Sequence, residues 1–127
     1  MALKSYRDLV VWQKAMDFVI DVYALTKDFP DEEKYGLISQ LRRAAVSVPT
    51  NVAEGYGRRH RGDYLRFVSI AQGSVCELET LLVISGRPGF ATREELRGPW
   101  GLPQEVGKML RALHGKLSDS SDGPAKP

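Results

Sequence analysis

Apolar residues recur at helical spacing in four segments of the chain, and no segment shows the strict alternation typical of a half-buried strand. The first segment covers residues 6 to about 26. Its apolar stripe consists of Trp12, Met16, Val19, Ile20 and Tyr23. We interpret this stripe as the face of a first helix that lies against the core. Pro30 ends the segment, because the residue before a proline is disfavoured in the helical region.

The second segment begins near Pro30 and carries another proline, Pro49, in its middle. Its apolar stripe keeps one helical phase on both sides of Pro49 and consists of Leu37, Leu41, Ala44, Ala45, Val48 and Val52. An unbroken phase predicts one long helix rather than two. We expect a kink at Pro49, because proline removes a backbone hydrogen bond and crowds the carbonyl four residues back. Gly55 and Gly57 are expected to end the helix.

The third segment, about residues 62 to 85, has the most regular pattern. Its apolar residues alternate spacings of four and three, at Tyr64, Val68, Ala71, Val75, Leu78 and Leu82. This spacing is typical of an a/d heptad seam in packed helices. Asp63 suits the N-cap or the first turn of such a helix.

The fourth segment starts with a capping box, in which Thr92 is followed three residues later by Glu95. Pro99 and Pro103 then follow, together with three glycines in the same stretch. We expect a short turn over residues 92 to 97 and an interruption near Gly98 to Pro103. A regular helix is expected from about residue 103 to 117.

Together the segments predict an all-α fold, an antiparallel up-down-up-down four-helix bundle. We assign residues 1–117 to a single bundle domain and 118–127 to a disordered polar tail, since 127 residues is an ordinary size for one domain. The longest purely aliphatic run, residues 81–84, is far shorter than the ~20 residues that a membrane helix needs. With a single cysteine and no signal-like N-terminus, the chain is expected to be cytoplasmic, with no membrane association.

Residues that carry enzyme chemistry are scarce, so no catalytic site, metal or cofactor is predicted. His60 and His114 have no partners at metal-ligand spacing, and Cys76 beside Val75 is interpreted as a buried or half-buried inert thiol. A glycine pair at residues 55 and 57 ends a helix instead of following a strand, so the dinucleotide-binding fingerprint fails.

Arginines are the most informative polar residues. The net charge of +2 is too small to indicate a charged partner by itself, so any such indication must come from local clusters of charge. The candidate nucleic-acid-binding residues are Arg42, Arg43, Arg58, Arg59 and Arg61. The planar guanidinium suits phosphates, which favours a backbone-binding patch for RNA or DNA. The alternative is that these arginines pair with acids of this chain or of an adjacent subunit, or simply solvate the surface. Both interpretations stay open at this point.

Several sequence words resemble, in order and spacing, those of one bacterial family: YRDLVVWQKA, the FP of residues 29 and 30, EKYGLISQLRRAAVSVPTNVAEGYGR and YLRFVSIAQGSVCELET. They cover about residues 6 to 85 and resemble the four-helix-bundle proteins encoded in intervening sequences of bacterial large-subunit (23S) ribosomal RNA genes. That family is labelled S23 ribosomal protein. It also includes the accessory variability protein of diversity-generating retroelements.

The resemblance implies an antiparallel four-helix bundle that assembles as a homopentamer and has no enzyme activity. In the retroelement member a basic surface binds nucleic acid and a reverse transcriptase, which implies the same use for the five arginines here. The departure is the RGPWGLP stretch, where the family has a regular, proline-free fourth helix. The leading hypothesis is therefore a non-enzymatic homo-oligomer that binds RNA or DNA, alone or with a protein partner. The alternative is an assembly or adaptor module that binds only proteins.

Overall fold

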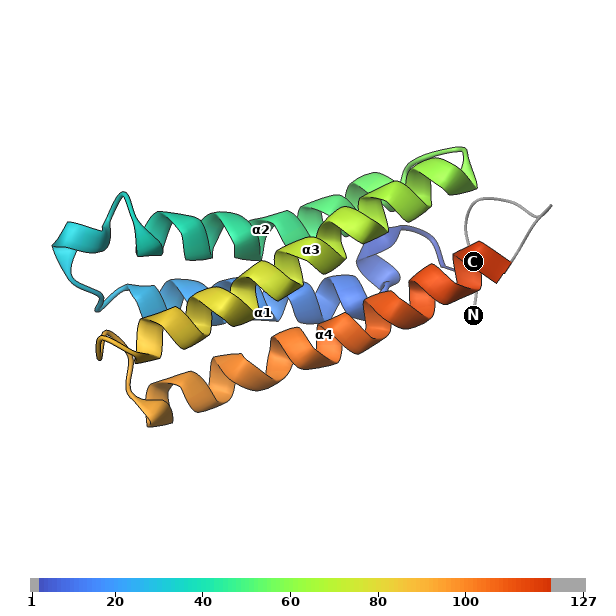
Figure 1. Ribbon diagram of the computed structural model, residues 1–127. Helices are drawn as coiled ribbons and strands as arrows, with labels where there is room; N and C mark the ends of the chain where they lie inside the picture. The colour runs from blue at the N-terminus through green and yellow to red at the C-terminus, as the bar shows by residue number, and fades with distance from the viewer. Residues whose placement is uncertain (1–2, 120–127) are drawn as a thin grey trace.

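The structure, a computed structural model, describes residues 3–119, and these form four long helices with no strand. The helices are α1 (Val10–Thr26), α2 (Leu37–Tyr56), α3 (Arg61–Gly86) and α4 (Arg93–Asp119), with short 3-10 turns η1 (Tyr6–Asp8) and η2 (Asp31–Glu33) before α1 and α2. The four helices lie side by side as a bundle, and short connections join successive helices (Figure 1). α2 packs against α1 and α3, and α4 closes the bundle against α3 and α1. The predicted all-helical, four-helix class is confirmed.

The apolar stripes predicted for α2 and α3 form the core. All twelve of their residues are buried, and eight of them, among them Leu41, Tyr64 and Leu78, have no exposed surface. α2 also runs through Pro49 as one helix, as its unbroken phase predicted. It begins at Leu37 rather than near Pro30, because η2 forms a separate acidic turn. The carboxylate of Glu33 then accepts a hydrogen bond from the backbone N–H of Leu37 at 3.1 Å, which satisfies one free donor at the helix start.

The core face predicted for the first helix is wrong. α1 buries Val11, Ala15, Phe18, Val22 and Thr26. Of the predicted stripe, Met16, Ile20 and Tyr23 are 38%, 66% and 43% exposed. The two stripes lie one residue apart and both have helical spacing. The apolar surface of α1 is therefore wider than the part of it that the other helices of the protomer bury. The side chains at 12 and 19 are half-buried at the border between the two faces.

The predicted interruption of the fourth helix near Gly98–Pro103 is also wrong. α4 is continuous, and Pro99 and Pro103 lie inside it as buried residues. Proline fixes φ near the helical value, so its cost is the lost backbone bond and the crowded carbonyl, about 3 kcal/mol in an exposed helix. Here both prolines are buried one turn apart, and burial of their apolar surface offsets that cost.

The predicted capping box at the start of α4 is confirmed. The backbone N–H of Thr92 donates to Glu95 Oε1 at 2.9 Å, and the N–H of Glu95 donates to Thr92 Oγ1 at 3.0 Å. These hydrogen bonds from Thr92 hold the pKa of Glu95 below its usual value. α4 ends at Asp119, so residues 118–119 of the predicted tail are helical and 120–127 lie outside the described residues.

The outward surface of α3 carries little charge. Between residues 67 and 86 its exposed residues, here called the α3 outer face, are Ser69, Ile70, Gly73, Cys76, Glu77, Thr80, Val83 and Ile84. Over the described part of the chain, α3 alone is long and apolar enough by composition to cross a membrane, and 33% of its most apolar stretch is buried inside the bundle. Helices of soluble bundles also have this character, so composition alone is weak evidence for a membrane span.

Candidate nucleic-acid interface

Three of the five predicted arginines meet where α2 ends and α3 begins. Arg58 and Arg59 lie in the connection of residues 57–60, and Arg61 is the first residue of α3. Arg66 follows one turn later, and together these four residues form what we call the arginine corner. Arg58, Arg59 and Arg66 are exposed and Arg61 is half-buried.

A close approach of the two helices positions this corner. A Cβ on Gly55 would lie 2.9 Å from the Cβ of Phe67 and 3.0 Å from a ring carbon of Tyr64, distances that real Cβ atoms essentially never show. Only glycine therefore lets the last turn of α2 lie this close to α3. Backbone N–H groups of Gly57 and Arg58 then donate to carbonyls of the same last turn, so the connection is a tight turn.

An aromatic ring orders two of the arginine corner's guanidinium groups. The guanidinium carbons of Arg58 and Arg66 each lie 4.8 Å from the centroid of the Phe67 ring. Arg58 Nη2 also donates to Glu54 Oε2 at 3.0 Å in an exposed ion pair. Cation–π contacts at the surface are worth about 0.5–1 kcal/mol each and restrict side chains that are otherwise free to move. A ring contact of this kind involves the face of the guanidinium group and not its N–H donors, of which the Nη2 group of Arg58 already pairs with Glu54.

The other two predicted arginines lie elsewhere. Arg42 bridges α2 to α1: its Nε donates to Thr26 Oγ1 at 2.9 Å and its guanidinium carbon lies 4.5 Å from the Tyr23 ring centroid. Arg43 is exposed beside it. Arg43 lies 13 residues before the end of α2 at Tyr56, about 20 Å along the helix at 1.5 Å per residue, and Arg58 lies beyond that end. The structure thus divides the predicted patch into an arginine corner and a separate pair on the first half of α2.

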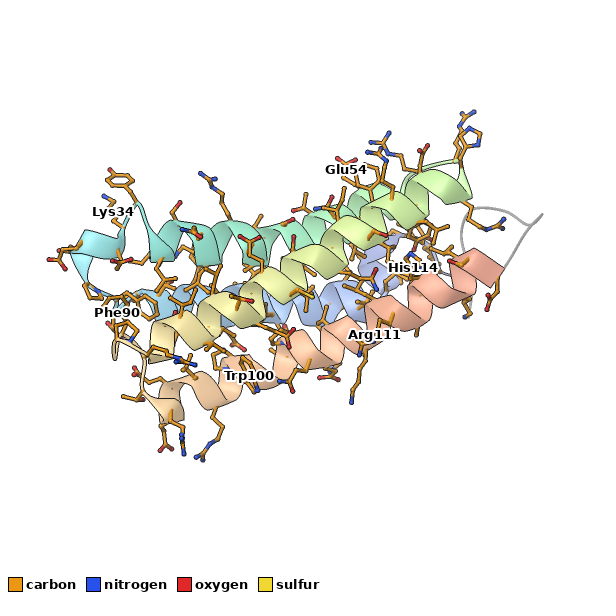
Figure 2. The ribbon with its side chains drawn as sticks, in the orientation of Figure 1. Lys34, Glu54, Phe90, Trp100, Arg111 and His114 are labelled. Carbon is orange, nitrogen blue, oxygen red and sulfur yellow. The ribbon has the colours of Figure 1, made fainter. Side chains whose placement is uncertain are left out.

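An apolar groove between α1 and α2 was missed by sequence reasoning. It has a volume of about 720 Å³ and is lined by Trp12, Met16, Val19, Val46, Pro49 and Ala53, with Glu54 and Arg58 at one end. Toward the other end of α2 it continues, through Val46 and Thr50, into a depression lined by Tyr23, Lys34, Arg42 and Arg43. Figure 2 shows Glu54 toward the arginine corner and Lys34 at the opposite end of the bundle. The signal was present in the sequence, since this lining contains Trp12, Met16, Val19 and Tyr23, four of the five residues that were assigned to the core.

The remaining candidate side chains do not assemble a reactive site. Cys76 is exposed, so the prediction of a buried or half-buried thiol was wrong. Its neighbour Val75 takes the core position and turns Cys76 outward. Within residues 3–119, no three His, Cys, Asp or Glu side chains are grouped closely enough to hold a metal ion.

Residues 7–112 match a family model described as the 23S rRNA-intervening sequence protein. The chain belongs to this family. The family resemblance noted from the sequence words is therefore confirmed. The matched residues span all of α1, α2 and α3 and most of α4, so the arginine corner and the α1–α2 groove both lie on the family domain.

A solved structure from the same group supports the fold. It is the crystal structure of a protein with unknown function from the S23 ribosomal protein family of Bacteroides thetaiotaomicron, with a TM-score of 0.75 and 22% sequence identity over 83% of this chain and 98% of that chain. At this identity the likeness extends to the fold alone. No protein with a curated function matches the sequence. Neither of the two descriptions found points to a catalytic activity.

Proposed function

We propose that this protein is a non-enzymatic, homo-oligomeric helical bundle that binds the phosphate backbone of RNA or DNA through Arg58, Arg59 and Arg61. The observation that carries the proposal is the local excess of positive charge at the arginine corner. Its four arginines have two carboxylates nearby in the sequence, Glu54 and Asp63. Within residues 3–119 no carboxylate lies within ion-pair distance of Arg59. Guanidinium groups in this setting suit phosphates, because their planar donors match pairs of phosphate oxygens.

The bundle supplies a rigid support for this surface. We infer an antiparallel up-down-up-down order with a bend in α2 at Pro49, supported by the cyclic packing of the helices and by the hydrogen bond that Pro49 cannot donate. Arg42 belongs to the α1–α2 contact, so we place it and Arg43 outside the phosphate-binding set. Self-association, as the pentamer that the family resemblance implies, would present several arginine corners at once and raise the affinity for a long polyanion. The proposed location is the cytoplasm.

The test is a salt titration of binding to labelled structured RNA and to duplex DNA. Arg58, Arg59 and Arg61 are changed together to alanine. For a phosphate reader, the logarithm of affinity falls linearly with the logarithm of salt concentration, and the triple variant lowers the slope by roughly 2–3 units, about 0.7–0.9 per lost contact.

The matched control removes three exposed cations from α4 instead: Lys108, Arg111 and Lys116. This triple variant has the same net charge as the first but keeps the arginine corner. It is expected to retain most of the wild-type slope. Equal losses in the two variants would mean that binding follows net charge alone, and no binding even at low salt would remove the nucleic-acid proposal.

A second candidate function, a protein-only assembly or adaptor module, is favoured by one observation, the exposed apolar α1–α2 groove. A partner protein such as a reverse transcriptase would then bind there, and the arginines would serve protein contacts. Charge reversal at Arg43 that dissociates the oligomer, combined with no salt-sensitive binding of nucleic acid, is the result that this alternative predicts. Nucleic-acid binding that depends on the arginine corner contradicts it.

A further inference from the structure

The α3 outer face has the composition of a contact surface. Seven of its eight residues are uncharged, and Glu77 is the exception. Ile70, Val83 and Ile84 are 42%, 45% and 46% exposed. Single exposed apolar residues are ordinary, but here they share one face of one helix with almost no charge between them. A face of this kind is more stable when a partner covers it.

The centre of this face is also flat. A Cβ added to Gly73 would meet no atom within 4 Å, so nothing inside the protomer requires a glycine there. Glycine in the middle of a helix is destabilising relative to alanine, because it has more freedom to lose on folding. A glycine among Ile70, Cys76 and Thr80 allows the backbone of another helix to approach closely.

The α1–α2 groove is the complementary shape within the same chain. Its lining includes two small side chains, Pro49 and Ala53, which leave room between α1 and α2. Met16 and Val46, which also line it, are 38% and 41% exposed. An apolar helix face of moderate width, without long side chains at its centre, fits such a groove.

Charge complementarity favours a second copy as the occupant. The groove's far end is lined by Lys34, Arg42 and Arg43 and by no carboxylate. The α3 outer face carries one charge, the carboxylate of Glu77, and within residues 3–119 no cation lies within ion-pair distance of it. Opposite charges at an interface fix the register and favour the correct partner.

We propose that the α3 outer face of one protomer packs into the α1–α2 groove of a neighbouring copy of the same chain, with Glu77 facing Arg43. The inference rests on the proposed self-assembly and names the two surfaces that produce it. α1 and α3 do not pack against each other within the described bundle, so the two surfaces lie on different sides of a protomer. Each protomer uses both at once, and this heterologous contact forms a closed ring when the rotation between copies closes.

The main test uses Gly73→Leu, because the open space at this position lets the protomer fold with the larger side chain. Sedimentation velocity over a range of protein concentrations measures assembly, and circular dichroism measures helix content. The expected result is unchanged helicity with a dissociation constant raised by about tenfold or more. Gly101→Leu is the matched control, since Gly101 is an exposed α4 glycine that also has open space around it, and it leaves assembly unchanged.

A charge exchange tests the register. Glu77→Arg and Arg43→Glu each weaken assembly, and the double variant restores it because the opposite charges again face each other. Glu79→Arg is the control, since Glu79 is a half-buried carboxylate of the same helix that lies outside the α3 outer face. A double variant as weak as the single variants overturns the contact between Glu77 and Arg43.

The outcomes separate this inference from the function on which it rests. A wild-type protein that is monomeric at every concentration removes the self-assembly altogether. A wild-type oligomer that Gly73→Leu leaves intact overturns only the choice of surfaces. Nucleic-acid binding is measured independently with an Arg59→Ala/Arg61→Ala variant. Its oligomer is expected to be unchanged, because both residues lie outside the α3 outer face and outside the lining of the α1–α2 groove.

Discussion

α3 and α4 are neighbours of similar length, yet their outward surfaces differ in kind. The exposed residues of α4 are mostly charged or strongly polar, among them Arg97, Gln104, Glu105 and Lys108, and Arg111 projects away from the bundle (Figure 2). The α3 outer face carries one charge among eight residues. Both helices contribute buried apolar residues to the same core, so the demands of the bundle do not explain the difference.

The contrast teaches that a helix can contain more apolar surface than its own fold uses. α4 follows the usual rule of one apolar stripe and a polar remainder. α3 and α1 depart from this rule, because each has exposed apolar residues besides its buried stripe. Those of α3 lie on its outer face, and those of α1 form the exposed stripe beside α2. Apolar surface beyond the needs of the protomer is typical of contact surfaces.

The largest expected effect contrasts the inner and outer faces of α3. Leu78 has no exposed surface, and Leu78→Ala is expected to lower the free energy of unfolding by about 3 kcal/mol, since it leaves a cavity in the core. Ile84→Ala on the outer face is expected to change the stability of the monomer by less than about 0.5 kcal/mol. Urea denaturation at low protein concentration measures both. Equal losses would show that the outer face is part of the protomer's own core.

The sequence was sufficient for α2 and α3 because the buried stripe of each keeps one regular helical phase along the whole helix. In α1 two stripes lie side by side, Val11, Ala15, Phe18 and Val22 next to Trp12, Met16, Val19 and Tyr23, and the spacing within each is four, three, four. Periodicity cannot choose between them, because the choice depends on which residues the neighbouring helices and any further copy cover. For α4 the interruption was predicted from the free-energy cost of proline in an exposed helix. Both prolines are buried in the structure, and their burial offsets that cost.

The candidate site was predictable only in part. A run of arginines is visible in the sequence, and three of the five predicted residues come together at the arginine corner. The role of Arg42 depends on Tyr23 and Thr26 of another helix, and no local pattern reveals such a long-range partner. The small residues that open the groove at Pro49 and Ala53 were likewise interpretable only after α1 was placed beside α2.

Two helical glycines sharpen the contrast between inner and outer surfaces. Gly55→Ala is expected to destabilise the protein by about 2 kcal/mol, because the new Cβ would force α2 away from Phe67 and Tyr64. Gly73→Ala meets open space and is expected to stabilise the monomer by up to about 1 kcal/mol. Thermal denaturation of both variants at low concentration provides the comparison. A Gly55→Ala protein as stable as the wild type would contradict the close approach that positions the arginine corner.

The smallest effect concerns Tyr64 on the inner face of α3. Its side chain has no exposed surface, and within residues 3–119 its hydroxyl has no hydrogen-bond partner. Burial, with a smaller contribution from Tyr56, raises the pKa of Tyr64 to about 12. A folded pKa above the unfolded value of 10 means that the folded state holds this proton more tightly, so stability falls as the pH rises from 10 to 12.

Tyr64→Phe removes that titration and is expected to lose less stability than the wild type over the same pH range. The difference should be about 1.4 kcal/mol at pH 11, because pH 11 lies one unit above the unfolded pKa of 10 and still below the folded pKa. The same substitution at neutral pH should be neutral or slightly stabilising, because it deletes a buried hydroxyl without a partner. Urea denaturation of both proteins at pH 8, 10 and 11 measures this, with Tyr35→Phe as the exposed control. Parallel losses in wild type and Tyr64→Phe would mean that the inner face of α3 admits water at Tyr64, and the contrast between its two faces would be weaker than the structure indicates.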